Sequence, residues 1–411
     1  MAKIMVALGL KSMERARWII LAAATLSMMI IGLYQYSWTL FVKPISAELT
    51  ATLVAVQLTF TIFTTLMTFA QPLAGIVADQ RGPFLLNILG GAIAGAGWIA
   101  SSYTSSVEIL YLTYGMGSVG VGILYATAVG VANKWFPDRR GLATGFASCG
   151  YGFGAAVLNP VLSWIIGSQS FREAFLYMGG AMLLSLLALG SLQRYPAADW
   201  LPNALAQKAK VKASVEAHQF RPKEMLGTPQ WWLIYLAFIL TSQTGLMVTS
   251  QLTSMGDSFK LSSSTVLMAT VIFPLTNGLG RIVGGRVSDH LGREVTMTLF
   301  FILQGVLSLF LLTFGSTDLA FITAVSLIGF FWGPIFTFFP SIIGDYYGRR
   351  YSTVNYGLTY TAKAWGGWIG GYITALISSL YGFSFSIILS TVFSFIAATL
   401  VFPKILKKPL A

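Results

Sequence analysis

The hydrophobic pattern divides the chain into long apolar stretches separated by short polar segments. About 20 apolar residues are needed to cross roughly 30 Å of hydrocarbon. Stretches of this kind occur at 17–42, 52–78, 84–104, 107–133, 141–168, 172–194, 229–256, 263–287, 294–315, 318–343, 351–379 and 383–402. Internal Gly, Pro, Ser and Thr are typical of membrane helices. The pattern predicts an all-α polytopic membrane protein with twelve transmembrane helices.

The predicted spans form two groups of six. The longest polar interruption between them, 195–228, carries several lysines and arginines. We therefore divide the chain into an N-terminal six-helix half at 1–194, a cytoplasmic central loop at 195–228 and a C-terminal six-helix half at 229–411. The motif Gly-x-x-x-Asp-x-x-Gly occurs at 75–82 and again at 285–292, an offset of 210. Such an internal repeat indicates a duplicated structural unit.

A second marker has the same offset. Arg139 and Arg140 precede the fifth span, and Arg349 and Arg350 precede the eleventh. Two independent markers at one offset predict two pseudo-symmetric halves.

Composition and charge support a membrane protein and give it an orientation. Hydrophobic residues make up 55% of the chain and charged residues 10%, whereas a soluble chain carries about 25% charge. With a cytoplasmic N-terminus, the inner segments hold 21 of the 26 lysines and arginines, and the outer segments hold Lys43, Arg172 and Lys260. By the positive-inside rule, both termini lie in the cytoplasm. We expect an integral protein of a prokaryotic cytoplasmic (inner) membrane.

The remaining composition excludes several classes of partner. The basic segments are short and distributed over every inner loop, so we expect no nucleic-acid partner. Cys149 is the only cysteine, and His218 and His290 are far apart in the chain, which argues against a disulfide and a histidine-built metal site. We predict no cofactor and no metal.

Two cations remain within the spans. Arg281 lies in the eighth and Lys363 in the eleventh. A cation in the bilayer interior costs several kcal/mol unless it faces a wet cavity or a partner. All fourteen Asp and Glu residues fall in the inner or outer segments, so no carboxylate remains to pair with these cations. An anionic ligand fits the missing charge; the alternatives are snorkelling or a contact with a helix C-terminus.

The surroundings of Arg281 suit a carboxylate. The planar guanidinium can hold a carboxylate through two parallel hydrogen bonds, whereas lysine offers a mobile point charge. Asn277, four residues earlier, is positioned either to orient the guanidinium and bind the same anion or to form a hydrogen bond between helices. The offset of 210 maps Arg281 to Gln71 and Lys363 to Phe153. We therefore expect the N-terminal half to supply shape and neutral hydrogen bonds.

Other motifs predict packing and gating. Glycine pairs at 141/145, 366/370 and 367/371 place small residues on one helix face, which allows close helix packing. Asp79 and Asp289 of the repeated motif can accept hydrogen bonds at a helix N-terminus or pair with arginine. We interpret these aspartates and the duplicated arginine pairs as gating residues.

The twelve spans, the repeated motif and the long central loop resemble the major facilitator superfamily. The segments 35–40 (QYSWTL), 133–143 (NKWFPDRRGLA), 355–357 (NYG) and 362–364 (AKA) are similar to the branch that holds oxalate/formate exchangers and bacterial monocarboxylate porters. The resemblance implies that Arg281 and Lys363 bind a substrate carboxylate. It also assigns cavity positions to Gln35, Tyr36, Tyr125, Trp332, Phe336 and Tyr360.

The sequence departs from the related patterns at three positions. The oxalate-type pattern has Tyr in place of Phe336 and Trp in place of Tyr360, so the aromatic cage around an oxalate site is altered. The animal monocarboxylate carriers have an acid in place of Asn277, so their coupling carboxylate is missing.

These observations together predict a secondary transporter. We expect proton-coupled symport of monocarboxylates such as lactate or pyruvate by alternating access, with Lys363 or the substrate itself carrying the proton. The alternative is an exchanger of the oxalate/formate or dicarboxylate type, in which two cations hold both ends of the ligand. An enzyme is not expected, because the spans contain no nucleophile–base pair, metal cluster or phosphate loop. We expect a functional monomer in the lipid bilayer.

Overall fold

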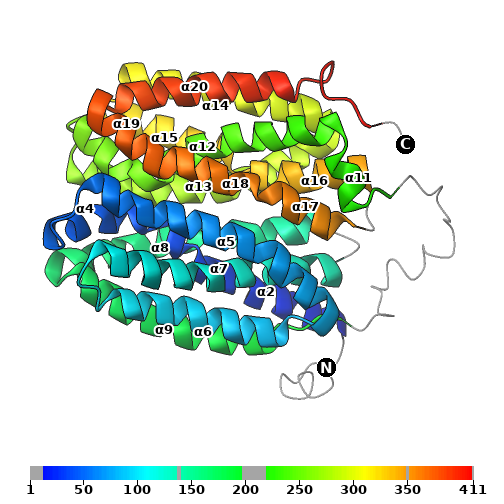
Figure 1. Cartoon of the computed structure of the whole chain (residues 1–411), viewed down its shortest axis with the longest axis horizontal. Helices are drawn as coiled ribbons and strands as arrows, with labels where there is room; N and C mark the ends of the chain where they lie inside the picture. Colours follow the sequence, from blue (N-terminus) through cyan, green and yellow to red (C-terminus); the bar gives the residue numbers. More distant parts are fainter. Residues whose placement is uncertain (1–12, 137–139, 197–218, 349–350, 410–411) are drawn as a thin grey trace.

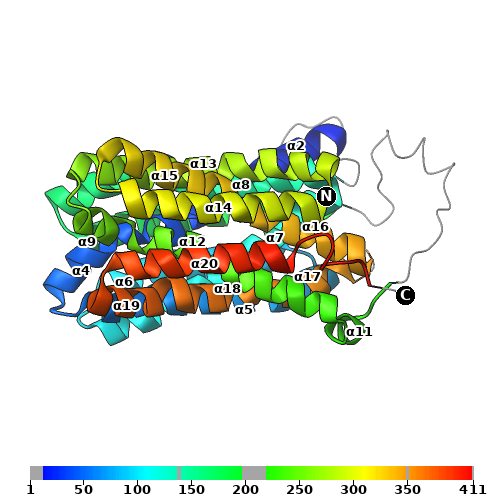
Figure 2. The same cartoon turned by 90° about the horizontal axis from the view of Figure 1, so that it is seen from above.

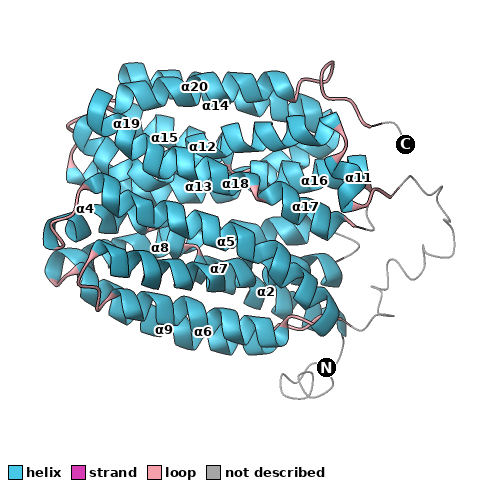
Figure 3. Cartoon of the chain, viewed as in Figure 1, coloured by secondary structure: helices cyan, strands magenta, loops and turns pink. Residues whose placement is uncertain are grey.

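The computed structural model describes residues 13–136, 140–196, 219–348 and 351–409, and within these ranges every regular element is a helix (Figure 3). Eleven helical segments in this part of the chain are long and apolar enough to cross a membrane. Each of the twelve predicted spans is occupied by helix. The chain therefore has the expected all-α polytopic architecture.

The N-terminal half begins with a broken span. Its elements are α2 (Met13–Ile31), α3 (Leu33–Tyr36), α4 (Trp38–Glu48), α5 (Leu53–Arg81), α6 (Phe84–Ser101), α7 (Val107–Trp135), α8 (Arg140–Ser168) and α9 (Phe171–Leu192). The first break falls at Gly32, where an added Cβ would lie 1.9 Å from the carbonyl oxygen of Tyr151 on α8. Only glycine allows the two backbones to approach this closely.

The C-terminal half follows the short helix α11 (Pro222–Leu226). Its elements are α12 (Pro229–Ser258), α13 (Ser263–Leu291), α14 (Arg293–Phe314), α15 (Asp318–Trp332), α16 (Ile335–Tyr347), α17 (Ser352–Tyr360), α18 (Ala362–Gly367), the π-helix η1 (Trp368–Ile373), α19 (Thr374–Tyr381) and α20 (Phe383–Leu400). The tenth span is interrupted at Gly333 and Pro334, and the eleventh consists of four consecutive segments.

The two halves lie side by side with their helices along one common direction (Figures 1 and 2). The start of α2, α11 and the end of α20 lie at one end of the molecule, which we call the termini end. The connection from α4 to α5 lies at the opposite end, which we call the α4 end (Figure 1). Between the halves, α13 packs against α8, α5 against α17, α18 and η1, and α12 against α4.

The predicted spans differ from the observed helices in continuity. The predicted spans at 17–42, 318–343 and 351–379 are each interrupted in the structure. The hydrophobic pattern does not predict these breaks, because it reflects only the apolar content of each span. The interruptions depend on backbone contacts. All three interrupted spans carry predicted site residues at or beside their breaks.

Candidate functional site

Arg281 lies in the middle of α13 with 1% of its surface exposed. Its Nη1 donates to the carbonyl oxygen of Ser148 on α8 at 2.9 Å, which joins the two halves. Its Nε and Nη2 donate to Oδ1 of Asn277 at 3.2 and 3.0 Å. A guanidinium has five N–H groups, and these three bonds leave one on each terminal nitrogen for a further acceptor.

Asn277 fixes the orientation of this guanidinium. Its Oδ1 also accepts a hydrogen bond from the Tyr36 hydroxyl at 2.9 Å. Its Nδ2 donates to the carbonyl oxygen of Gly329 on α15 at 3.4 Å. The amide therefore contacts both the Arg281 guanidinium and a neighbouring helix.

Lys363 is the second buried cation, on α18, with 1% of its surface exposed. Its Nζ donates to Oε1 of Gln35 on α3 at 2.8 Å and lies 3.4 Å from the Tyr360 hydroxyl. The Tyr151 hydroxyl donates to the same Gln35 oxygen at 3.4 Å. Because Gln35 belongs to the N-terminal half, this bond also joins the two halves.

One aromatic ring lies beside both cations. The Phe336 centroid lies 4.7 Å from Cζ of Arg281 and 5.4 Å from Nζ of Lys363. Both distances are within the range of cation–π attraction. The two cationic groups are therefore within about 10 Å of each other, the sum of these two distances.

The remaining predicted aromatics complete this cluster. The Trp332 ring lies 5.4 Å from Phe336, and the Tyr125 ring lies 5.9 Å from Tyr360. Tyr125 also contacts Tyr151 at 5.4 Å between centroids. All nine residues predicted to bind the substrate are thus linked through direct contacts at the boundary of the halves.

The site has an excess of hydrogen-bond donors. Nε2 of Gln35 and Nε1 of Trp332 are buried, and within the described residues they have no hydrogen-bond partner. No described carboxylate forms an ion pair with Arg281 or Lys363. Buried polar groups in proteins are normally paired. Two cations and several unused N–H donors around one cluster are the chemistry that receives an anion.

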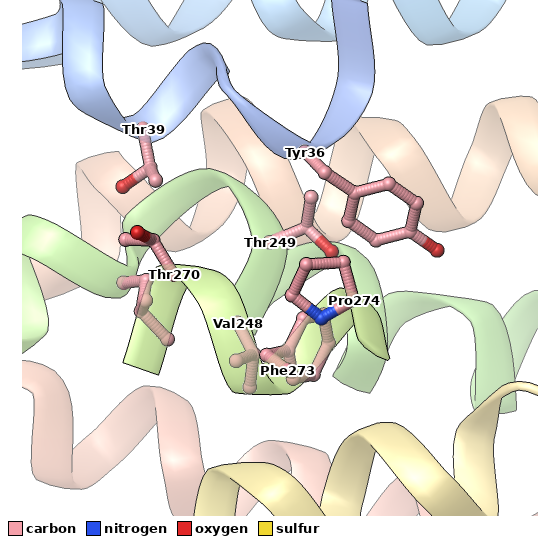
Figure 4. Close-up of a pocket in the computed structure, with 8 residues that line it drawn as sticks. Tyr36, Thr39, Val248, Thr249, Thr270, Phe273 and Pro274 are labelled. Carbon is pink, nitrogen blue, oxygen red and sulfur yellow. The ribbon is translucent and has the colours of Figure 1, made fainter. Parts of the chain in front are cut away.

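A small cavity of about 10 Å³ lies between this cluster and the α4 end, which is room for about one water molecule. Figure 4 shows Tyr36 and Thr39 on one side of it and residues of α12 and α13 on the other. Its lining comprises Tyr36, Thr39, Val248, Thr249, Leu252, Thr270, Phe273 and Pro274. Side chains of both halves therefore leave little free space at this cavity.

Polar contacts between the halves close the α4 end. Oγ1 of Thr39 accepts a hydrogen bond from the Thr253 backbone at 3.0 Å, and the Thr253 hydroxyl donates to the Thr39 carbonyl at 2.8 Å. Nε2 of Gln57 donates to the Ser250 carbonyl at 2.7 Å. An exposed ion pair between Lys43 and Asp257 lies at the rim.

These contacts are distributed asymmetrically. Between pairs of residues that the structure describes, every hydrogen bond and ion pair joining the halves lies at the level of the two buried cations or nearer the α4 end. At the termini end, the contact of α5 with α17 includes Pro72 beside Gly357.

The predicted gating aspartates form ion pairs within their own halves. Asp79 Oδ1 lies 2.7 Å from Lys134 Nζ, and Asp289 Oδ1 lies 2.6 Å from Arg293 Nη1. Arg139, Arg349 and Arg350 lie outside the described residues. Arg140 begins α8, and its side chain lies outside the described part as well.

Three contributors to the site were missed by the sequence analysis. They are the backbone carbonyl of Ser148, the Tyr151 hydroxyl and the Met67 sulfur, which lies 3.8 Å from Nζ of Lys363. A backbone carbonyl leaves no mark in a sequence. Tyr151 is a polar aromatic residue inside a span, which indicates weakly that it could line the site. The chain contains 57 aromatic residues, so this feature alone does not single it out.

Two helical halves with a buried cationic site between them are the architecture of a membrane transporter built from repeats. The sequence profile of the Major Facilitator Superfamily matches residues 18–371 and 239–410, so the chain belongs to this superfamily, which is a family of transporters and not of enzymes. The chain is 36% identical over 392 residues to the oxalate:formate antiporter of Oxalobacter formigenes, which covers 94% of this chain and 92% of that protein.

More distant relatives are also transporters. The chain is 24% identical over 350 residues to the uncharacterized MFS-type transporter YhjX of Escherichia coli (strain K12), over 84% of this chain and 85% of that protein. It is 36% identical over 124 residues to the human monocarboxylate transporter 12, over 30% of this chain and 24% of that protein.

Proposed function

We propose that this protein carries small carboxylates across the membrane, and that the carboxylate binds between Arg281 and Lys363. The observation that carries the proposal is the pair of buried cations beside one Phe336 ring without a described counter-ion. A carboxylate would supply the missing charge and accept from the two unused N–H groups of Arg281. Its binding would also lower the repulsion between the two cations. The ligand would therefore stabilise the closed state, in which the cations are buried together, more than an open state.

The preferred substrate in this proposal is a monocarboxylate of the size of lactate or pyruvate. Arg281 has two N–H groups available for one carboxylate, whereas the Lys363 ammonium already donates to Gln35 at 2.8 Å. The Phe336 ring has no hydroxyl to bind a second carboxylate. A proton accompanies the anion, either on the substrate or at Lys363, because the described cluster contains no Asp, Glu or His.

The second candidate is exchange of the oxalate/formate type. The similarity to the antiporter over 94% of the chain favours it. Lys363 is close enough to Arg281 to hold the second carboxylate of a dicarboxylate if Gln35 releases it. The two candidates differ in what drives uptake. Exchange requires a second carboxylate on the opposite side of the membrane, whereas symport requires a proton from the same side as the substrate.

The proposal also includes orientation and gating. The termini end faces the cytoplasm of a prokaryotic cell, because the positive-inside rule places most cations there. The chain works as a monomer, with halves at 1–194 and 229–411 and a central loop at 195–228. The ion pairs of Asp79 and Asp289, together with the duplicated arginine pairs, stabilise the halves during opening and closing.

Uptake into proteoliposomes tests the function. Purified protein is reconstituted, and uptake of radiolabelled L-lactate, pyruvate, formate and oxalate is measured with empty and with formate-loaded vesicles, at equal pH and with an acidic exterior. For symport, L-lactate accumulates in empty vesicles only when the exterior is acidic. For exchange, oxalate uptake requires internal formate and does not respond to the pH gradient.

A matched control identifies the site. Lys404 is exposed and lies outside the spans, so Lys404→Ala removes one cation without touching the cluster. Normal uptake by Lys404→Ala and loss of uptake by Arg281→Ala support the assignment. Lack of saturable uptake of all four acids by the wild type would overturn carboxylate transport.

A further inference from the structure

A side chain from the N-terminal half is inserted into the backbone of the eleventh span. The Thr61 hydroxyl on α5 accepts a hydrogen bond from the Tyr372 amide at 3.0 Å and donates to the Gly367 carbonyl at 3.4 Å. Residues 367 and 372 are five apart, which is the spacing of a π-helical hydrogen bond. The hydroxyl therefore bridges an amide and a carbonyl within the helical ladder of the other half.

The surrounding π-helix, Trp368–Ile373, depends on other side chains as well. Ser250 donates to the Gly370 carbonyl at 3.1 Å, and Nε2 of Gln251 donates to the Gly371 carbonyl at 3.1 Å. Insertion of a side chain into a helical ladder is a recognised cause of local distortion. The irregular segment is therefore held by α12 of its own half and by Thr61 of the other half.

The glycines explain how Thr61 reaches the ladder. A Cβ added at Gly371 would lie 2.6 Å from Oγ1 of Thr61, and one added at Gly367 would lie 2.2 Å from Oγ1 of Thr64. The predicted packing pair 367/371 thus faces α5 across the boundary of the halves. Its lack of side chains is what admits the hydroxyl.

The bridge belongs to the set of contacts that closes the α4 end. Gln57, one helical turn before Thr61 on α5, donates to the Ser250 carbonyl and to Oε1 of Gln251 at 2.7 and 3.3 Å. Both α12 residues also hold the π-helix. These contacts join α5 to α12 and to the eleventh span, so the halves could part at the α4 end only if they broke and Thr61 left the ladder.

We propose that Thr61 is a positioning residue that couples closure of the α4 end to the position of Lys363. With the hydroxyl inserted, the segment is π-helical. When the halves part at the α4 end, the ladder closes into an α-helix. Each residue of an α-helix turns the chain by about 100°. A change from π-helical to α-helical hydrogen bonds between α18 and α19 therefore rotates these two helices relative to each other, and Lys363 on α18 moves with this rotation.

The equilibrium between closed and open α4 ends tests the contribution of Thr61 to closure without any ligand. Spin labels are placed at Ala47→Cys on α4 and Ser258→Cys on α12, both exposed positions at the α4 end, in a Cys149→Ala background. Double electron–electron resonance then gives the ratio of short to long distances. Thr61→Val should lower this ratio on the order of tenfold, because a buried amide and carbonyl lose their partner in the closed state.

Two matched variants separate the bridge from packing. Thr61→Ser retains the hydroxyl and should restore the wild-type ratio. Thr65→Val removes a hydroxyl that, among the described residues, donates to the Thr61 carbonyl within α5 at 2.8 Å, and it should leave the ratio unchanged. If Thr61→Val fails to insert, Gly371→Ala tests the same bridge, because the new Cβ displaces the hydroxyl. Unchanged ratios in whichever of these two variants inserts would overturn the proposal.

A thermodynamic cycle tests the link to Lys363. L-lactate affinity is measured for the wild type, Thr61→Val, Lys363→Gln and the double variant. The effect of Thr61→Val on affinity should disappear in the Lys363→Gln background, whereas two independent structural effects would add. This cycle rests on the proposed function, whereas the spin-label experiment needs no substrate and tests the role of Thr61 in closure even if carboxylate transport is disproved.

Discussion

Gln35 and Tyr36 are consecutive residues on α3, yet they serve different cations of the opposite half. Gln35 accepts a hydrogen bond from Lys363 at 2.8 Å, and Tyr36 donates at 2.9 Å to Asn277, which in turn orients Arg281. A single four-residue segment of the N-terminal half therefore contacts both Lys363 and the amide that orients Arg281. Any movement of α3 changes the surroundings of both cations together.

Arg281→Lys should abolish most of the substrate binding even though it keeps the charge. Lysine cannot retain the two hydrogen bonds to Asn277 and the bond to the Ser148 carbonyl and also offer two parallel N–H donors to a carboxylate. We expect an affinity loss of about 10- to 100-fold, from hydrogen bonds to charged groups worth about 1.5–3 kcal/mol. Calorimetric titration with L-lactate measures it, and affinity within twofold of wild type would contradict the bidentate site.

Asn277→Asp should make uptake more dependent on acid pH. A carboxylate at this position would pair with Arg281 and compete with the substrate, so affinity at neutral pH should fall about tenfold. Acidification protonates the new carboxyl group and relieves this competition. The control is Asn277→Ala, which loses the orienting amide but adds no charge, so its defect should be the same at every pH. Parallel pH profiles for the two variants would exclude the competition.

Phe336→Tyr combined with Tyr360→Trp should shift the preference towards oxalate. The two changes introduce the residues of the oxalate-type pattern: Phe336→Tyr adds a hydroxyl beside both cations, and Tyr360→Trp replaces the hydroxyl near Lys363 with an indole N–H donor. A site that hydrogen-bonds a substrate group discriminates strongly against ligands that lack it. We expect the ratio of oxalate to lactate uptake to rise about tenfold. Proteoliposome competition assays measure the ratio, with each single variant as a control; no change would locate selectivity elsewhere.

Thr39→Val should open the α4 end more than Lys43→Ala does. Lys43 and Asp257 are half exposed, and such surface ion pairs contribute about 0–1 kcal/mol. Thr39 and Thr253 are buried and share reciprocal hydrogen bonds, so valine leaves a buried donor unpaired at about 1–3 kcal/mol. The spin-label pair at Ala47 and Ser258 measures the ratio of short to long distances in both variants. A larger decrease for Lys43→Ala than for Thr39→Val would contradict this prediction.

The chemistry of the site was more predictable from the sequence than its geometry. Arg281 and Lys363 stand out because charge inside a span is costly and because every carboxylate could be assigned elsewhere. Asn277 followed from helical spacing. The bonds of Tyr36 and Gln35 to these groups depend on how two halves dock, and no local pattern encodes a docking contact between residues more than 200 positions apart.

The π-helix was beyond prediction for the same reason. Residues 366–371 contain two glycine pairs, which predict close packing, and the structure places these glycines against α5 and α12. That packing also admits the Thr61 hydroxyl, but this depends on the position of a threonine more than 300 residues earlier. The duplicated motif, by contrast, placed Asp79 and Asp289 equivalently, although each aspartate pairs with a cation in its own half.

The uncompensated pair of Arg281 and Lys363 makes the empty carrier sensitive to membrane voltage. Moving one elementary charge through a potential of 100 mV changes the free energy by about 2.3 kcal/mol. When the cavity opens to the negative side of the membrane, both cations acquire the potential of that side, so the voltage favours this state. A monocarboxylate that binds without a proton halves the net charge of the cavity, so the loaded carrier then responds half as strongly as the empty one. A monocarboxylate that brings a proton leaves the net charge unchanged, and the loaded and empty carriers then respond equally. The voltage response of the loaded protein would thus separate exchange of anions from symport with a proton.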